Sequence, residues 1–191
     1  MENAKQVQFR KSVRHFNTPH DAHFLTFSCF RRQQFLKSRR PLEWLSESVT
    51  KACIERQFAL WGYVFMPEHV HLLISANNDE YDVSSFLHFV KQSVTNKARA
   101  FAKSSDKPRT TWDAFLDLQP SGRVYFRFWQ RGSGYDVNVA GPDHAREVLE
   151  YMHNNPVKRE LCHSPAEWNY SSAAHYLGHG EGPVPVTTAP I

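Results

Sequence analysis

A run of apolar and aromatic residues, interrupted once, most strongly constrains the fold of this 191-residue chain. Residues 58–66, FALWGYVFM, and residues 69–74, HVHLLI, have the β-branched and aromatic content of two strands. Pro67 and Glu68 lie between them and fit a turn. The sequence therefore predicts a β-hairpin here, and we expect its second strand to be central in a sheet.

The flanking segments alternate between strand and helix patterns. Short strands are predicted at 23–30, 125–130 and 135–139, and helices at 41–57, from Ser84 or Ser85 (either of which can cap) to about Lys103, and at 141–155. One hairpin and two crossover helices in this order predict an α+β fold of the ferredoxin-like kind. We expect a central antiparallel sheet of four to five strands that carries the two histidines, with helices packed on it.

Length and composition suit one domain, because 41% hydrophobic residues in a chain of this size supply one core. We expect a basic arm at 1–20, a single domain at 21–178 with a turn-rich excursion at 104–124, and a disordered tail at 179–191. No apolar run approaches the roughly 20 residues of a membrane span, and the start has no signal-peptide core, so we expect no membrane partner and a cytoplasmic location. Three cysteines without a C-x-x-C pair predict reduced thiols.

Positive charge is concentrated at the start of the chain. Residues 1–40 contain nine Lys or Arg and two acids, a net charge of +7, whereas the whole chain has +4. Phenylalanines are interleaved with these cations, as on surfaces that bind phosphates and stack on bases. A solvated basic arm remains the alternative.

His69 and His71 are one residue apart in the second hairpin strand, so both side chains lie on one face. The pair favours a metal site over two separate hydrogen-bonded histidines, and it needs a third ligand. In the last helix, Tyr151 and Asn155 are one turn apart, and an Asn oxygen is an acceptable ligand for a hard divalent ion. Tyr151 would then stand ready as a nucleophile. A core-edge tyrosine and a capping asparagine are the alternative, which the helix alone favours.

Three motifs in order, MPEHVHLLI, FWQRG and YMHNNPVKREL, resemble the single-tyrosine HUH transposases, and most closely the REP-associated branch, over about residues 15–175. The resemblance implies that His69, His71 and Asn155 bind a divalent metal, magnesium or manganese, and that Tyr151 is the nucleophile. It also implies cleavage of single-stranded DNA beside hairpin-forming palindromes, through a 5′-phosphotyrosine, by a monomer or a homodimer.

Two positions depart from the family pattern. Glu68 stands where relatives commonly have Asn or Asp, and we interpret it as a turn residue rather than as a partner of an imidazole. The segment after FWQRG lacks the family's usual polar residue. Tyr135, in this segment, is a rival nucleophile without an acceptor four residues on.

Several cations are candidate contacts for single-stranded or hairpin DNA: Arg10, Lys11, Arg14, Arg31, Arg32, Arg99, Lys103, Lys158 and Arg159. The resulting hypothesis is a metal-dependent single-stranded DNA endonuclease and strand transferase, that is, a transposase. The alternatives are a regulator that binds structured DNA without cleaving it, a nickase of the replication-initiator or relaxase type, and a small metal-binding domain without nucleic acid.

Overall fold

The computed structural model of the protein describes residues 18, 21–104 and 108–191. In chain order its elements are β1 (Ala22–Ser28), η1 (Phe30–Arg32), α1 (Arg39–Glu55), β2 (Phe58–Phe65), β3 (His69–Ala76), α2 (Val83–Lys103), α3 (Arg109–Asp113), β4 (Leu116–Leu118), β5 (Val124–Phe126), β6 (Tyr135–Val139), α4 (Gly141–His153), α5 (Asn155–Lys158), η2 (Pro165–Glu167) and α6 (Ala173–Tyr176). No helix in the described part of the chain is long and apolar enough to cross a bilayer.

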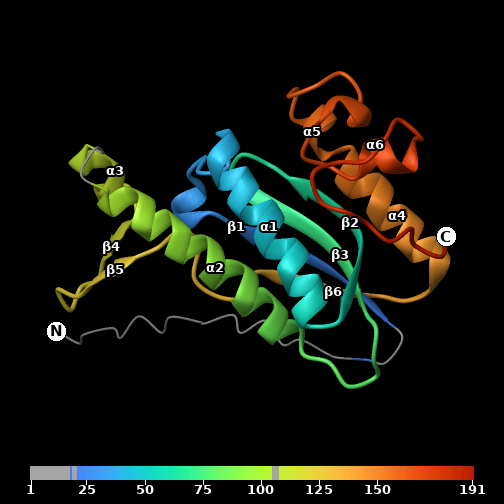
Figure 1. The fold of residues 1–191 in the computed structure, drawn as a ribbon, viewed down its shortest axis with the longest axis horizontal. Helices are drawn as coiled ribbons and strands as arrows, with labels where there is room; N and C mark the ends of the chain where they lie inside the picture. Colours follow the sequence, from blue (N-terminus) through green and yellow to red (C-terminus); the bar gives the residue numbers. More distant parts are fainter. Residues whose placement is uncertain (1–17, 19–20, 105–107) are drawn as a thin grey trace, which may run out of the picture.

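Four strands form one antiparallel sheet in the order β2-β3-β1-β6 (Figure 1). β2 and β3 make the predicted hairpin, and β3 and β1 are the two central strands. α1 connects β1 to β2, and α2 begins the connection from β3 to β6. This topology confirms the predicted α+β fold with a ferredoxin-like sheet.

The two faces of the sheet bury different side chains. Val70, Leu72 and Ile74 of β3 join the larger core, which α1 and α2 cover, whereas Leu73 joins a smaller core with residues of α4. Successive strand residues point to opposite faces, so the two histidines of β3 share the side of Leu73. Figure 1 shows α1 and α2 together over the sheet and α4 apart from them. The histidine pair therefore faces α4.

The segment between α2 and β6 extends beyond the sheet, where α3 and the β4–β5 hairpin lie beside the C-terminal half of α2 (Figure 1). The Phe115 ring stacks on those of Phe126 and Phe128, at 4.7 Å and 5.9 Å between centroids. These contacts tie the excursion to the larger core. The strand predicted at 125–130 is shorter than expected, because Phe128 and Trp129 leave the hairpin and enter that core.

The N-cap of α2 is Asp82 rather than the predicted Ser84 or Ser85. Its side chain accepts a hydrogen bond from the backbone N–H of Ser84 at 2.8 Å. An aspartate satisfies a free donor of the first turn and also places negative charge at the positive end of the helix.

Residues 179–191, which we expected to be disordered, pack against the fold instead. Val184 and Ala189 are buried, and the backbone N–H of Thr187 donates to the Leu60 carbonyl of β2 at 2.8 Å. The segment is rich in Gly and Pro, and its few apolar residues are spaced so that they reach buried positions. The composition of the segment therefore did not predict that it packs against the fold.

Candidate active site

His69 and His71 begin β3 with their rings in an edge-to-face arrangement, at 4.7 Å between centroids. Their Nε2 atoms are 3.0 Å apart. The other nitrogen of each ring has a partner of its own, since His71 Nδ1 lies 2.8 Å from Thr26 Oγ1 and His69 Nδ1 lies 3.0 Å from Glu68 Oε1. The two Nε2 atoms are therefore left facing each other, within hydrogen-bond distance, on the α4 side of the sheet.

Glu68 holds His69 from behind. Its Oε1 accepts hydrogen bonds from His69 Nδ1 and from Arg159 Nη1, the latter at 2.9 Å, and its Oε2 is buried without a hydrogen-bond partner among the described residues. This corrects the interpretation of Glu68 as only a turn residue, because the turn carries its carboxylate back onto the neighbouring imidazole. A carboxylate in this position fixes the tautomer and the orientation of a metal-binding histidine.

The protonation states follow from burial and from these partners. Burial lowers the pKa of His71 to about 3, and it also lowers the pKa of His69, against the opposite effect of the Glu68 carboxylate. Burial raises the pKa of Glu68, but Arg159 and His69 together hold it below its ordinary value. Near neutral pH the site thus holds two uncharged imidazoles and one carboxylate. Since a carboxylate can only accept from Nδ1–H, His69 Nε2 presents a lone pair.

The donor set fits a divalent metal ion. Two nitrogens bound side by side to an octahedral ion, each at about 2.1 Å, are about 3 Å apart, which matches the observed Nε2 separation. In the described part of the chain, no three His, Cys, Asp or Glu side chains converge as a metal site. An amide oxygen is a third kind of ligand that such a pair of imidazoles accepts for a hard divalent ion.

Tyr151 lies on α4 beside the histidine pair. Its ring is 6.1 Å from that of His71 and 6.0 Å from that of Phe24, edge to face in both cases. The side chain is 50% exposed, and Lys158 Nζ lies 5.4 Å from the ring centroid. The hydroxyl of a half-exposed tyrosine is accessible to a macromolecular substrate, and a cation stands next to it.

Asn155 follows one turn after Tyr151, but not on an unbroken helix. α4 ends at His153, Asn154 caps it, and Asn155 is the first residue of α5. The side chain of Asn155 is half-buried and has no hydrogen-bond partner among the described residues. Its amide oxygen is therefore available as a ligand.

Tyr135, the rival nucleophile, is the first residue of β6 and is 59% exposed. The register pairs it with Thr26 of β1, and Thr26 pairs with His71 of β3 on its other side. Tyr135 is thus on the same face as the histidine pair, but one strand farther away than Thr26. Among the described residues, a ring contact with His71 is made by Tyr151 and not by Tyr135.

The predicted DNA contacts lie in three places. Arg31 and Arg32 are in η1, Arg99 and Lys103 in the second half of α2, and Lys158 and Arg159 directly after the tyrosine helix; all six are exposed. Arg159 also holds Glu68. Arg10, Lys11 and Arg14 lie outside the described residues.

Sequence patterns did not identify Thr26 as the hydrogen-bond partner of His71. Its role depends on the β1–β3 register, which pairs two residues 45 positions apart in the chain. The alternation of polar and apolar residues in β1 places Thr26 on one face, but only the register shows which histidine it meets.

Known proteins resemble this chain in sequence and in fold. Residues 18–155 match the family model described as "Transposase IS200 like". A Haemophilus influenzae protein named as a REP-associated tyrosine transposase is 25% identical over 124 residues, which are 64% of this chain and 62% of that protein. The solved structure of a REP-associated tyrosine transposase bound to a REP hairpin superposes with a TM-score of 0.67 at 19% identity, over 95% of this chain and 93% of the other. The chain belongs to the IS200-like transposase family.

Proposed function

We propose that the protein is a single-stranded DNA endonuclease and strand transferase that recognises hairpin-forming palindromic DNA and cleaves it with Tyr151. One observation carries the proposal: the accessible Tyr151 ring lies 6.1 Å from His71, whose Nε2 converges with that of His69. A nucleophile next to a prepared cation site is the arrangement that phosphodiester cleavage requires. The H. influenzae relative and the hairpin-bound structure support hairpin DNA as the substrate.

His69 Nε2, His71 Nε2 and the Asn155 amide oxygen would hold a magnesium or manganese ion. When bound, that ion supplies positive charge to the oxygens of the scissile phosphate. Thr26 and Glu68 keep the two imidazoles oriented, and Arg159 keeps Glu68 ionised.

Tyr151 forms the new covalent bond. Its Oη loses its proton and attacks phosphorus, the bond from phosphorus to the 3′ oxygen breaks, and the departing 3′ oxygen takes up a proton, so that no net proton is gained or lost. The products are a 5′-phosphotyrosine and a free 3′-hydroxyl. Attack by a 3′-hydroxyl on the phosphotyrosine reverses the step, so cutting and joining need no external energy source.

The exposed cations would hold the DNA backbone. Lys158 and Arg159 stand nearest to Tyr151, Arg31 and Arg32 follow the end of β1, and Arg99 and Lys103 lie on α2. Contacts of this kind set the position of the strand but carry little sequence information. Action on DNA of this kind agrees with the cytoplasmic location expected from the sequence.

The test is a cleavage assay on fluorescent single-stranded hairpin oligonucleotides taken from beside the gene, with and without manganese. We expect a slow-migrating, protease-sensitive adduct on a denaturing gel for wild type and for the matched control Tyr135→Phe, but none for Tyr151→Phe. The adduct should require the metal. If wild type binds the hairpins but forms no adduct, the protein is a structured-DNA binder and the proposal is wrong.

A further inference from the structure

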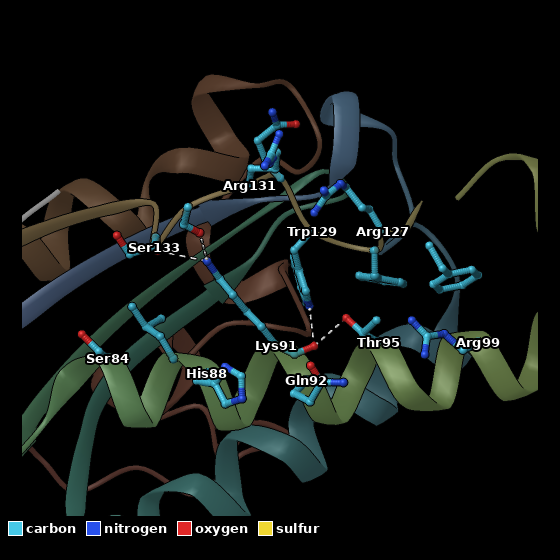
Figure 2. A pocket seen from close by; sticks show the side chains of 15 residues that line it. Ser84, His88, Lys91, Gln92, Thr95, Arg99, Arg127, Trp129, Arg131 and Ser133 are labelled. Carbon is cyan, nitrogen blue, oxygen red and sulfur yellow. Dashed lines mark hydrogen bonds between the residues drawn. The ribbon is translucent and has the colours of Figure 1, made fainter. Parts of the chain in front are cut away.

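A polar cavity lies on the other side of the sheet from the histidine pair, between α2 and residues 126–133 (Figure 2). Its volume is about 370 Å³, within the usual range for ligand pockets of roughly 300–1,000 Å³. Figure 2 shows side chains of α2 meeting those of the 126–133 segment across this space. We call it the α2 pocket.

The α2 pocket is strongly one-sided in charge. Lys91, Arg99, Arg127 and Arg131 line it, and none of its 15 lining residues is acidic. Asp117, outside the pocket, forms an ion pair with Arg127. The other three cations have no acidic partner among the residues that the structure describes.

Lys91 is the innermost of these cations. Its Nζ donates to the backbone carbonyls of Gly132 and Ser133, each at 3.0 Å, and lies 4.8 Å from the centroid of the Phe27 ring. Burial lowers the pKa of Lys91 to about 8, because carbonyls and a ring compensate only part of the lost hydration. A half-buried ammonium that meets only carbonyls and a ring keeps its charge uncompensated, so this arrangement favours an anionic ligand.

The pocket opens close to β3, the strand that carries His69 and His71. The backbone N–H of Gln130, on the pocket rim, donates to the Ser28 carbonyl at 2.8 Å, and Ser28 pairs with His69 across β1 and β3. Arg31 joins the same region, since its backbone N–H donates to Gln130 Oε1 at 3.0 Å. Two strand spacings, about 10 Å, separate His69 from Gln130. A short single strand passing around the end of β1 can span that distance.

We propose that the α2 pocket binds backbone phosphates of the single-stranded DNA that leads away from the active site. The inference deepens the proposed function, because it rests on single-stranded DNA as the substrate. Lys91 contacts the strand from inside the pocket, and Arg99 and Arg131 contact it from the rim. Of the cations identified from the sequence, Arg99 is the one that lines this pocket.

The test measures binding of a fluorescein-labelled strand of about twenty thymidines in a chelator, where no cleavage occurs, over a series of salt concentrations. Each phosphate contact to a single strand contributes about 0.7 to the slope of log K against log salt. We expect Arg99→Gln combined with Arg131→Gln to reduce the slope by about 1.4. Lys51→Gln removes an exposed cation of α1 outside the pocket and should leave the slope unchanged. An equal slope for the double variant and for wild type would overturn the proposal.

A second experiment distinguishes a DNA strand from a free nucleotide as the ligand, because both carry phosphate groups. If thymidine monophosphate binds wild type by calorimetry and the thymidine strand is unaffected by the double variant, the pocket holds a nucleotide and the strand assignment is wrong. A bromodeoxyuridine-substituted strand should crosslink to residues 88–99 or 126–133, and crosslinks elsewhere only would also overturn it.

These binding results are independent of the cleavage test. An adduct on Tyr151 together with an unchanged salt slope would leave the proposed function standing and remove the α2 pocket from it. A reduced salt slope without any adduct would support strand binding in the α2 pocket and contradict cleavage by Tyr151.

Discussion

The two sides of the sheet, both proposed to contact DNA, differ in the charge of the side chains that they present. On the α4 side, His69 and His71 are uncharged and buried, and Glu68 and Thr26 fix their orientation. On the α2 side, the pocket is open and lined by cations without any lining acid. Histidine ligands for a metal must be deprotonated and held in a fixed orientation, whereas phosphate contacts require positive charge. The difference assigns DNA cleavage to the α4 side and binding of the DNA strand to the α2 side. Substitutions can test each side separately.

The largest effect should come from removing a ligand on the α4 side. We expect His71→Ala to lower metal-dependent cleavage by more than about 100-fold, because only one imidazole would remain to hold the ion. Binding of the thymidine strand in chelator should stay at the wild-type level. His163→Ala, an exposed histidine elsewhere, is the control. Loss of strand binding in His71→Ala would contradict the division between the two sides.

We also expect a residue on the α4 side, His153, to make the free energy of unfolding depend on pH. His153 of α4 is buried against Ser172, and burial lowers its pKa to about 4. Between the unfolded value of about 6.5 and this value, the unfolded chain binds a proton that the folded chain does not, so the free energy of unfolding falls as the pH falls. Urea unfolding of wild type and His153→Gln should show the wild-type advantage shrinking by about 2 kcal/mol from about pH 7 to about pH 5. A constant difference would show that His153 does not titrate abnormally.

Glu68→Gln tests the hydrogen bond that orients His69, a proposed metal ligand. The amide keeps the shape of the side chain but loses the charge that fixes His69, so manganese affinity should fall about 10- to 100-fold by calorimetry. Arg159→Lys keeps a cation beside Glu68 but loses the planar guanidinium donors, and we expect a smaller loss. Unchanged affinity in Glu68→Gln would return Glu68 to the role of a turn residue.

Two glycines, one in the loop after the α2 pocket and one in β2, have little room for a side chain. Gly134, in the loop after the α2 pocket, has φ 95°, and an added Cβ would lie 2.2 Å from the Thr26 carbonyl oxygen. Gly62 of β2 has room limited by α4, where a Cβ would lie 2.5 Å from Leu149 Cδ2, the movable end of a side chain. We expect Gly134→Ala to cost about 2 kcal/mol of unfolding free energy or more, and Gly62→Ala about 1 kcal/mol, by urea unfolding. A larger cost for Gly62→Ala than for Gly134→Ala would show that the loop at Gly134 adjusts to a side chain more readily than the contact of β2 with α4.

The strand and helix patterns predicted the hairpin, the sheet and the histidine pair, because each depends on local periodicity. The contacts that complete the site depend on pairs far apart in the chain. Arg159 meets Glu68 across 91 positions, and Lys91 reaches Ser133 across 42. No local pattern encodes such a pair, so the contact of Arg159 with Glu68 and the α2 pocket could not be predicted from one sequence.

The packing of residues 179–191 was missed for a different reason. Their composition resembles that of disordered segments, and composition averages over the few positions that matter. Val184 and Ala189 are buried although the residues around them are mostly Gly, Pro and Thr. The N-cap of α2 could not be chosen from the sequence either, because Asp82, Ser84 and Ser85 are all residue types that cap helices.

The most direct test of the central claim is to identify the residue that carries DNA after the reaction. Wild-type protein would be incubated with hairpin oligonucleotide and manganese, digested with nuclease and protease, and analysed by tandem mass spectrometry. We predict a nucleotide attached through its 5′ phosphate to the phenolic oxygen of Tyr151, with Tyr135 unmodified. The nucleotide on Tyr135 would contradict the account, because the metal site would then serve the tyrosine on β6 rather than the one on α4.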